Sequence, residues 1–194
     1  MKTRCLVLCI LVTLACAGSA FSQNGGVEVF GGYSYQHMNT QGLNGFNAAV
    51  TGSLSSMVGI TGEISRHSKS MSTAVIDPFD QSVSVIDANA SILGFRFGPK
   101  ITSHMSDTAS FFVQPLIGMY RLSAGGSVSG ITGSTSATGF TTAMGSGFDL
   151  RVSPRIAVRP AQIDWIYLRS TDLLGVATGN SNGFRYSGGV VVKF

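Results

Sequence analysis

The chain has 194 residues, of which only 11% are Asp, Glu, Lys or Arg, against about 25% in an average soluble domain. Its 13 basic and 9 acidic residues give a formal net charge of +4 without a polybasic run, so the composition does not favour nucleic-acid binding. The 25 glycines and the scarcity of charge together are unusual for a fold that faces water on all sides.

The first predicted element is a secretory signal peptide over residues 1–22. Lys2 and Arg4 form a short basic start, and residues 5–16 that follow are almost purely apolar. A membrane-spanning helix needs about 20 apolar residues, so this run is too short to serve as an anchor. We therefore expect cleavage and a mature domain over residues 23–194.

Removal of this segment changes the chemistry that remains available. All three cysteines, Cys5, Cys9 and Cys16, lie within it, so the mature domain has no thiol for a disulfide, a metal site or a nucleophile. The loss of Lys2 and Arg4 would leave 11 basic residues against 9 acidic ones. We expect no cofactor.

The rest of the chain alternates apolar residues with polar or small ones, with the period of two that is typical of β-strands. In the fifth segment the second face is also apolar, with Phe112, Leu116 and Tyr120, so its orientation is ambiguous. In the seventh, the pattern breaks at Pro160-Ala161, which predicts a β-bulge. The eight segments are residues 27–37, 45–54, 57–65, 91–100, 111–120, 139–152, 155–168 and 183–194.

The connections between these segments are expected to alternate in length. Short ones follow the second, fourth and sixth segments, and longer ones follow the others; the longest are residues 67–88 and 122–138. Short turns at one rim and long loops at the other are typical of outer-membrane barrels. The pattern predicts one all-β domain, an eight-stranded antiparallel up-and-down transmembrane β-barrel.

The composition of the second face indicates which side would meet lipid. In a soluble barrel the outward face normally carries Lys and Glu, whereas here it carries mainly Gly, Ala, Ser, Thr and Asn. Small residues suit the narrow interior of an eight-stranded barrel, and the bulky apolar residues of the first face suit contact with lipid. A soluble periplasmic ligand-binding barrel is the alternative.

Aromatic residues near the strand ends are expected to mark the two membrane interfaces. Their rings are apolar enough for lipid and tolerate the headgroup level. These residues are Tyr33, Tyr35, Phe112, Trp165, Tyr167 and Tyr186.

The few charges on the small-residue face are expected to pair inside the barrel, because a lone buried charge is costly. We interpret them as a structural plug of the lumen; the alternative is a gated solute path through the same side chains. Pairing Val152 with Ile156 across the short turn brings Asp149 opposite Arg159. Asp164 and Arg185 fall at similar heights on the seventh and eighth segments, and Glu63 and Arg96 fall on the third and fourth.

Two further features bear on activity. The histidines His37, His67 and His104 are spread over both predicted rims, and nothing in the sequence fixes an acid beside the adjacent His67 and Ser68, so we expect no enzyme. Residues 72–90 are unusually apolar for a free loop. We interpret this stretch as an extended hairpin, with an adhesive or partner-binding edge as the functional alternative.

The whole pattern resembles the small outer-membrane β-barrel domain family that includes the OmpA transmembrane domain and OmpX. The resemblance spans essentially all of the mature chain and rests on the leader, "GGYSYQH", "GFRFGPK", "GSGFDLRVSPRIAVRP" and "YSGGVVVKF". It implies a location in the bacterial outer membrane. In that family a C-terminal aromatic after alternating apolar residues resembles an assembly signal, matched here by Tyr186, Val190, Val192 and Phe194.

The resemblance also implies the partners and the role. We expect outer-membrane lipid and lipopolysaccharide, the barrel-assembly machinery and periplasmic chaperones as partners, no nucleic acid, and a monomer. The expected function is a structural or surface role with a mostly plugged lumen. A narrow porin-like channel or a surface adhesin is the alternative, and a lipid A-modifying enzyme, which shares only the architecture, is not expected.

Overall fold

The computed structural model describes residues 26–38, 41–76, 83–128, 131–170 and 180–194. The predicted signal peptide, residues 1–22, lies outside the described residues and stays a prediction. Within the described ranges no helix is long and apolar enough to cross a membrane.

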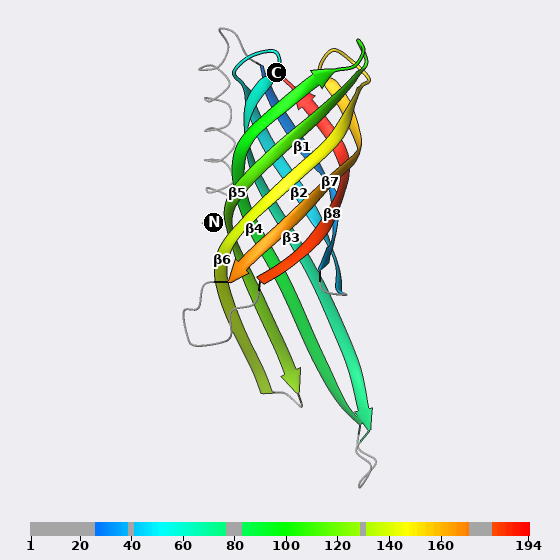
Figure 1. The fold of residues 1–194 in the computed structure, drawn as a ribbon. Helices are drawn as coiled ribbons and strands as arrows, with labels where there is room; N and C mark the ends of the chain where they lie inside the picture. Colours follow the sequence, from blue (N-terminus) through cyan, green and yellow to red (C-terminus); the bar gives the residue numbers. More distant parts are fainter. Residues whose placement is uncertain (1–25, 39–40, 77–82, 129–130, 171–179) are drawn as a thin grey trace, which may run out of the picture.

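Eight antiparallel strands close into a barrel, which confirms the predicted fold class (Figure 1). Each strand pairs with the next in the chain, and the last pairs with the first, so the wall has no open edge. The strands are β1 (Val27–Met38), β2 (Gln41–Ser53), β3 (Val58–Ile76), β4 (Val83–His104), β5 (Ala109–Val128), β6 (Ile131–Arg151), β7 (Ile156–Ser170) and β8 (Asn180–Lys193).

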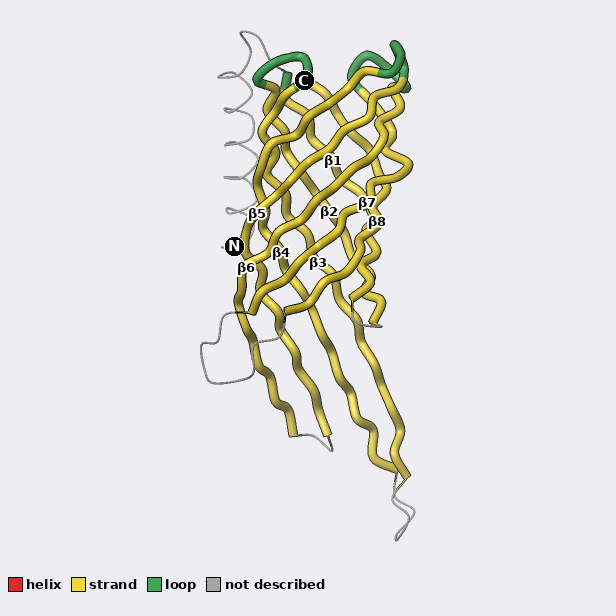
Figure 2. Tube along the Cα trace, in the orientation of Figure 1, coloured by secondary structure: helices red, strands yellow, loops and turns green. Residues whose placement is uncertain are grey.

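One rim carries the short turns, as predicted. The turns β2–β3, β4–β5 and β6–β7 lie at the same end of the barrel as the C-terminus (Figure 2). There the backbone N–H of Phe194 donates to the carbonyl of Val27 at 2.9 Å, so the last residue is still paired with the first strand. We call this end the turn rim and the opposite end the hairpin rim.

The long connections at the hairpin rim are mostly strand, so the prediction of a loop over residues 122–138 was wrong. β3 and β4 stay paired out to Ile76 and Val83, and β5 and β6 out to Val128 and Ile131. These hairpins project beyond the rest of the barrel (Figure 2). Beyond the barrel wall both faces of a hairpin can meet water, so the alternation that marks the wall segments is lost there. The interpretation of residues 72–90 as a hairpin extension is confirmed for its described part.

The first connection is also shorter than predicted. Only residues 39 and 40 separate β1 from β2, because both strands extend past the segments that alternate clearly. Gly42 and Gly45, near the start of β2, interrupt the apolar pattern that would have revealed it.

The irregularity of the seventh strand is confirmed. The β7–β8 register shifts between Arg159 and Gln162, around Pro160-Ala161. The Tyr186 hydroxyl donates to the Pro160 carbonyl at 2.6 Å. Because Pro160 and Ala161 together oppose the single residue Gly188, the strand has one extra residue here, and Arg159 and Gln162 both face inward.

The two faces of the wall are distributed as the alternation predicted. On β4, Phe95 and Phe97 are 53% and 60% exposed, while Arg96 between them is 5% exposed. The same apolar-out, polar-in order recurs around the barrel. A soluble barrel has the opposite order, so the arrangement argues against the soluble periplasmic alternative.

The ambiguous fifth segment places Phe112, Leu116 and Tyr120 inward. The prediction that Phe112 belongs to an interfacial girdle was therefore wrong. Its ring is fully buried, with the Arg159 guanidinium 4.2 Å and the Lys100 ammonium 4.7 Å from the ring centroid. Buried cations favour an aromatic face beside them, which explains an inward Phe here. The predicted girdle residues Tyr33, Tyr35, Trp165 and Tyr186 do face outward and are exposed.

Candidate functional site

The centre of the barrel interior is a carboxylate held between two guanidinium groups. Glu63 on β3 lies opposite Arg96 on β4 in the strand register, and Arg96 Nε donates to Glu63 Oε1 at 2.9 Å. Arg96 Nη2 also donates to Ser65 Oγ at 2.7 Å. From the far side of the barrel, Arg185 on β8 donates through Nη1 and Nη2 to the two oxygens of Glu63, at 2.9 and 2.6 Å.

Arg185 also joins this centre to β7. Asp164 lies opposite Arg185 in the β7–β8 register, and Arg185 Nε donates to Asp164 Oδ2 at 2.9 Å. Gln162 donates to both oxygens of Asp164, at 2.9 and 3.1 Å. All three guanidinium nitrogens of Arg185 thereby donate hydrogen bonds, to Asp164 on β7 and to Glu63 on β3. These bonds fix β3, β7 and β8 relative to one another.

A second cluster lies nearer the turn rim. Arg159 grips Asp149 with two parallel hydrogen bonds, Nε to Oδ1 at 2.7 Å and Nη2 to Oδ2 at 3.0 Å. Its third nitrogen, Nη1, donates to Gln162 Oε1 at 2.8 Å, so Gln162 links the two clusters. Such two-pronged pairs are both strong and geometrically specific.

The network continues to the turn rim through residues that the sequence analysis did not single out. Lys100 Nζ lies 2.6 Å from Glu28 Oε2 and 3.6 Å from Asp149 Oδ2, and Lys193 Nζ lies 3.0 Å from Glu28 Oε1. The signal was present, since Glu28 and Lys100 both fall on the small-residue face of their strands.

All three predicted pairs are thus in contact in the structure. We call the whole set the interior network; its buried cations are Arg96, Lys100, Arg159 and Arg185, and its acids are Glu28, Glu63, Asp149 and Asp164. The four buried cations equal the four acids in number, and the partly exposed Lys193 adds a fifth cation at the turn rim. Sequence reasoning missed the Glu63–Arg185 contact, because β3 and β8 are not neighbours and no register relates them.

The histidine beside this network does not form the pair considered from the sequence. His67 points inward and is 1% exposed, whereas Ser68, the next residue along the strand, is exposed. His67 Nε2 instead lies 2.9 Å from Ser34 Oγ, which lies 3.0 Å from Ser187 Oγ. Among the described residues, no acid accepts a hydrogen bond from His67 Nδ1, and no group of acids, histidines or cysteines could hold a metal ion.

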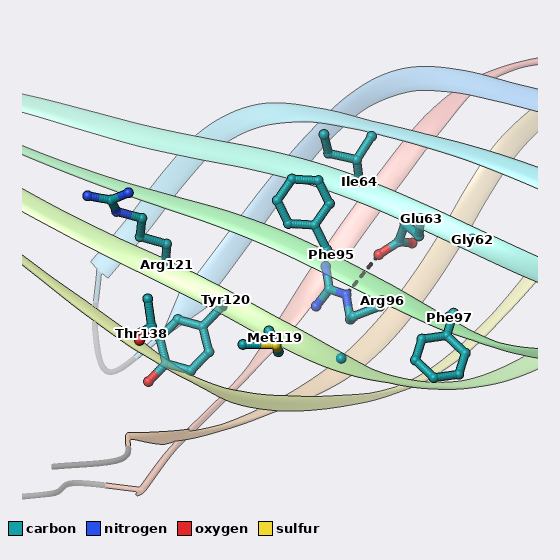
Figure 3. Close-up of a pocket in the computed structure, with 11 residues that line it drawn as sticks. Gly62, Glu63, Ile64, Phe95, Arg96, Phe97, Met119, Tyr120, Arg121 and Thr138 are labelled. Atoms are coloured by element: carbon teal, nitrogen blue, oxygen red, sulfur yellow. Dashed lines mark hydrogen bonds and ion pairs between the residues drawn. The ribbon is translucent and has the colours of Figure 1, made fainter. Parts of the chain in front are cut away.

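The outward face carries a groove of about 790 Å³ across β3, β4, β5 and β6. Its lining is mainly apolar and includes Gly62, Ile64, Phe95 and Met119. Figure 3 shows Arg121 and Thr138 at one end of this groove and Gly62 and Phe97 toward the other. We call it the β3–β6 groove. The Glu63–Arg96 pair lies behind it, on the inner side of the same wall.

The residues of the predicted assembly signal lie along β8 toward the turn rim. Tyr186 and Val190 face outward and are about half exposed, and Phe194 is 75% exposed. Val192 pairs with Val29 of β1, so this apolar strip lies on the seam where the barrel closes.

Comparison with known proteins supports the fold. The sequence matches no protein-family model and no curated protein. Ail, the attachment invasion locus protein of Yersinia pestis, has a similar structure, with 17% identity over 89% of this chain and 100% of that chain and a TM-score of 0.62. Neisserial surface protein A shares 12% identity over 88% of this chain and 97% of that chain, with a TM-score of 0.55.

A major outer membrane protein from Thermus thermophilus is also similar, with 8% identity over 87% of this chain and 99% of that chain and a TM-score of 0.54. At such identities the likeness concerns the fold. The resemblance to small outer-membrane β-barrels that the sequence suggested is therefore confirmed at the level of architecture.

Proposed function

We propose that this chain is a monomeric β-barrel protein of the bacterial outer membrane, with a structural or surface role and a plugged lumen. The observation that carries the proposal is the inside-out order of the wall, apolar outside and charged within. A closed barrel satisfies its backbone hydrogen bonds within the wall, as a lipid environment requires.

The location can be tested without knowledge of a ligand. We expect the full chain in the outer-membrane fraction, with faster gel migration before boiling than after, because the closed barrel resists unheated detergent. Recovery in the osmotic-shock fraction would instead support a soluble periplasmic protein.

The plug is supported by the interior network. A solute path needs space or mobile side chains, whereas Arg185, Asp164 and Glu63 are each at most 4% exposed and hold one another with hydrogen bonds of 2.6 to 2.9 Å. Opening a path through them would separate buried ion pairs, which costs several kcal/mol per unpaired ion.

We therefore expect no conductance from the purified chain in planar lipid bilayers. A matched variant, Arg185→Ser, removes the side chain that spans the lumen from β8 to β3 and is expected to give measurable ion currents. Stable single-channel steps from the unaltered chain would favour the narrow-channel alternative.

No enzymatic activity is proposed. His67, the one buried histidine among the described residues, hydrogen-bonds the Ser34 hydroxyl and no acid, whereas a hydrolytic site would need an acid hydrogen-bonded to it. An unchanged lipid A mass spectrum after overexpression is the expected result.

We further propose that the strip Tyr186, Val190, Val192 and Phe194 is read during assembly by the barrel-assembly machinery, after delivery by periplasmic chaperones. Support comes from its position on the closing seam and from the exposed side chains of Tyr186, Val190 and Phe194. Outer-membrane lipid, including lipopolysaccharide, would surround the apolar wall.

A second candidate function, adhesion, is favoured by the projecting hairpins. β3 pairs with β2 only as far as Ser68, and β6 pairs with β7 only from Gly139 onward. Of the strands that the structure describes, none pairs with the outer edge of residues 70–76 or of residues 131–138. Such edges can accept an added strand from a partner.

This candidate predicts a specific loss. Ser72 and Asp87 face each other in the β3–β4 register. Replacement of residues 73–86 by Asn-Gly would connect them through a favourable two-residue turn. We expect bacteria that express this variant to adhere less to cultured cell monolayers. The control replaces residues 128–131 in the same way and leaves the β3 edge intact; equal adhesion of the two variants would count against the β3 edge.

A further inference from the structure

The apolar wall is not uniform, because the β3–β6 groove has a cationic end. Arg66, Leu93, Arg121 and Thr138 occupy one row of the register across β3, β4, β5 and β6. All four are on the outward face, and Arg66, Arg121 and Thr138 are exposed. The row borders the apolar residues Ile64, Phe95 and Met119 on the side of the hairpin rim.

The depth of Arg121 places it near a membrane interface. Arg121 is the thirteenth residue of β5, counted from Ala109 at the turn rim. At about 3.4 Å per residue and a tilt of about 40°, that length crosses roughly 30 Å, the thickness of the hydrocarbon core. An arginine at this depth meets lipid headgroups, while the groove below it meets acyl chains.

The groove has free space at Gly62 that an acyl chain could occupy. A Cβ added to Gly62 would meet no atom within 4 Å, so the absence of a side chain leaves space rather than relieving a clash. The groove volume of about 790 Å³ lies within the range of specific ligand sites, about 300–1,000 Å³. Annular lipid on a featureless wall would find no such depression.

The charged end selects the headgroup. Arg121 Nη2 donates to Ser136 Oγ at 3.3 Å, which leaves its other donors available to a ligand. A guanidinium group can donate two parallel hydrogen bonds to two oxygens of one phosphate group. The hydroxyl groups of Ser136 and Thr138 are exposed beside it and suit a sugar.

From these features we propose that the β3–β6 groove binds one molecule of lipopolysaccharide, with an acyl chain along Gly62, Ile64 and Phe95 and a sugar phosphate on Arg121. The proposal rests on the outer-membrane location proposed above. With the turn rim on the periplasmic side, Arg121 lies at the headgroup level of the outer leaflet, where the phosphorylated glycolipid resides.

The test uses the full chain folded in detergent micelles, titrated with lipopolysaccharide and followed by native mass spectrometry. We expect saturation at one glycolipid per chain. Arg121→Gln removes the phosphate partner, and Gly62→Leu fills the groove; each is expected to weaken binding about tenfold or more. Lipopolysaccharide without its lipid A phosphates should bind the unaltered chain as weakly as intact lipopolysaccharide binds Arg121→Gln.

Matched controls exist on other parts of the wall. Arg169 on β7 is a further exposed outward arginine; it lies opposite Phe140 and does not line the groove. Gly31 on β1 is a further outward glycine with no atom within 4 Å of an added Cβ. Arg169→Gln and Gly31→Leu should bind as the unaltered chain does. Equal losses in all four variants, or equal binding of the dephosphorylated glycolipid or of phosphatidylglycerol, would overturn the proposal.

The experiments distinguish a wrong proposal of glycolipid binding from a wrong proposal of an outer-membrane location. If the chain fractionates with the outer membrane and migrates as a folded barrel, but Arg121→Gln binds normally, the groove alone is rejected. Recovery of the chain as a soluble periplasmic protein rejects both. If Gly62→Leu does not fold, as shown by its gel migration, the Arg121→Gln titration decides.

Discussion

Replacement of Glu63 by Gln is expected to lower the free energy of unfolding by about 3–5 kcal/mol, a large share of the total stability of a single domain. Glu63 is the only carboxylate that hydrogen-bonds Arg96 among the described residues, and it also receives two hydrogen bonds from Arg185. Its neutralisation leaves one excess positive charge in the interior. The amide accepts at one oxygen and offers no compensating charge.

The measurement is equilibrium unfolding by urea of the refolded chain in lipid vesicles. Asp87→Asn is a suitable control, because Asp87 is an exposed hairpin residue that accepts a hydrogen bond from Ser72 at 2.6 Å. Its cost should stay within about 0.5 kcal/mol. The double variant Glu63→Gln, Arg96→Gln restores equal charge and should recover part of the loss. A single variant as stable as the control would mean that the network does not bear on stability.

Gly32→Val is expected to prevent closure of the barrel. Gly32 faces Gly189 across the β1–β8 seam, and a Cβ at position 32 would collide with the Gly188 carbonyl oxygen. Overpacking between side chains costs about 1–3 kcal/mol, and a collision with backbone costs more because the backbone of a closed sheet cannot turn away. Valine favours strands over glycine, so local propensity alone predicts the opposite effect.

The adjacent glycine supplies the control. A Cβ at Gly31 meets no atom within 4 Å, so Gly31→Val should give a folded barrel at least as stable as the unaltered chain. The compact gel band of unboiled samples reports closure in both variants. We expect that band to be lost for Gly32→Val alone; its persistence there would show that the seam can widen.

The sequence predicted which residues face outward and which face inward wherever a strand of the wall separates lipid from the narrow interior. On β4, Phe95 and Phe97 had to share one face and Arg96 the other, and the structure agrees. The same reasoning placed Asp149 near Arg159, because the turn between them fixes the register. It could not predict which face of β5 points inward, because both faces of this strand are apolar; Phe112 and Leu116 in fact face inward.

Prediction failed at the hairpin rim for a related reason. Residues 122–138 are rich in Gly, Ser and Thr, and their polarity suggested loops, yet β5 and β6 pair through most of them. A strand whose two faces both meet water has no need to alternate. Its pairing is set by the partner strand, which continues from the wall below.

By itself, the sequence determined the strand count, the closed up-and-down order, the apolar face and the inward placement of the charges, because each depends on neighbours along the chain or across one turn. Only the tertiary structure decided that Glu63 receives Arg185 from the opposite side of the barrel, and that Gly62 and Arg121 belong to one groove. These relations depend on how closure and strand tilt bring separate strands together, and no local period encodes them.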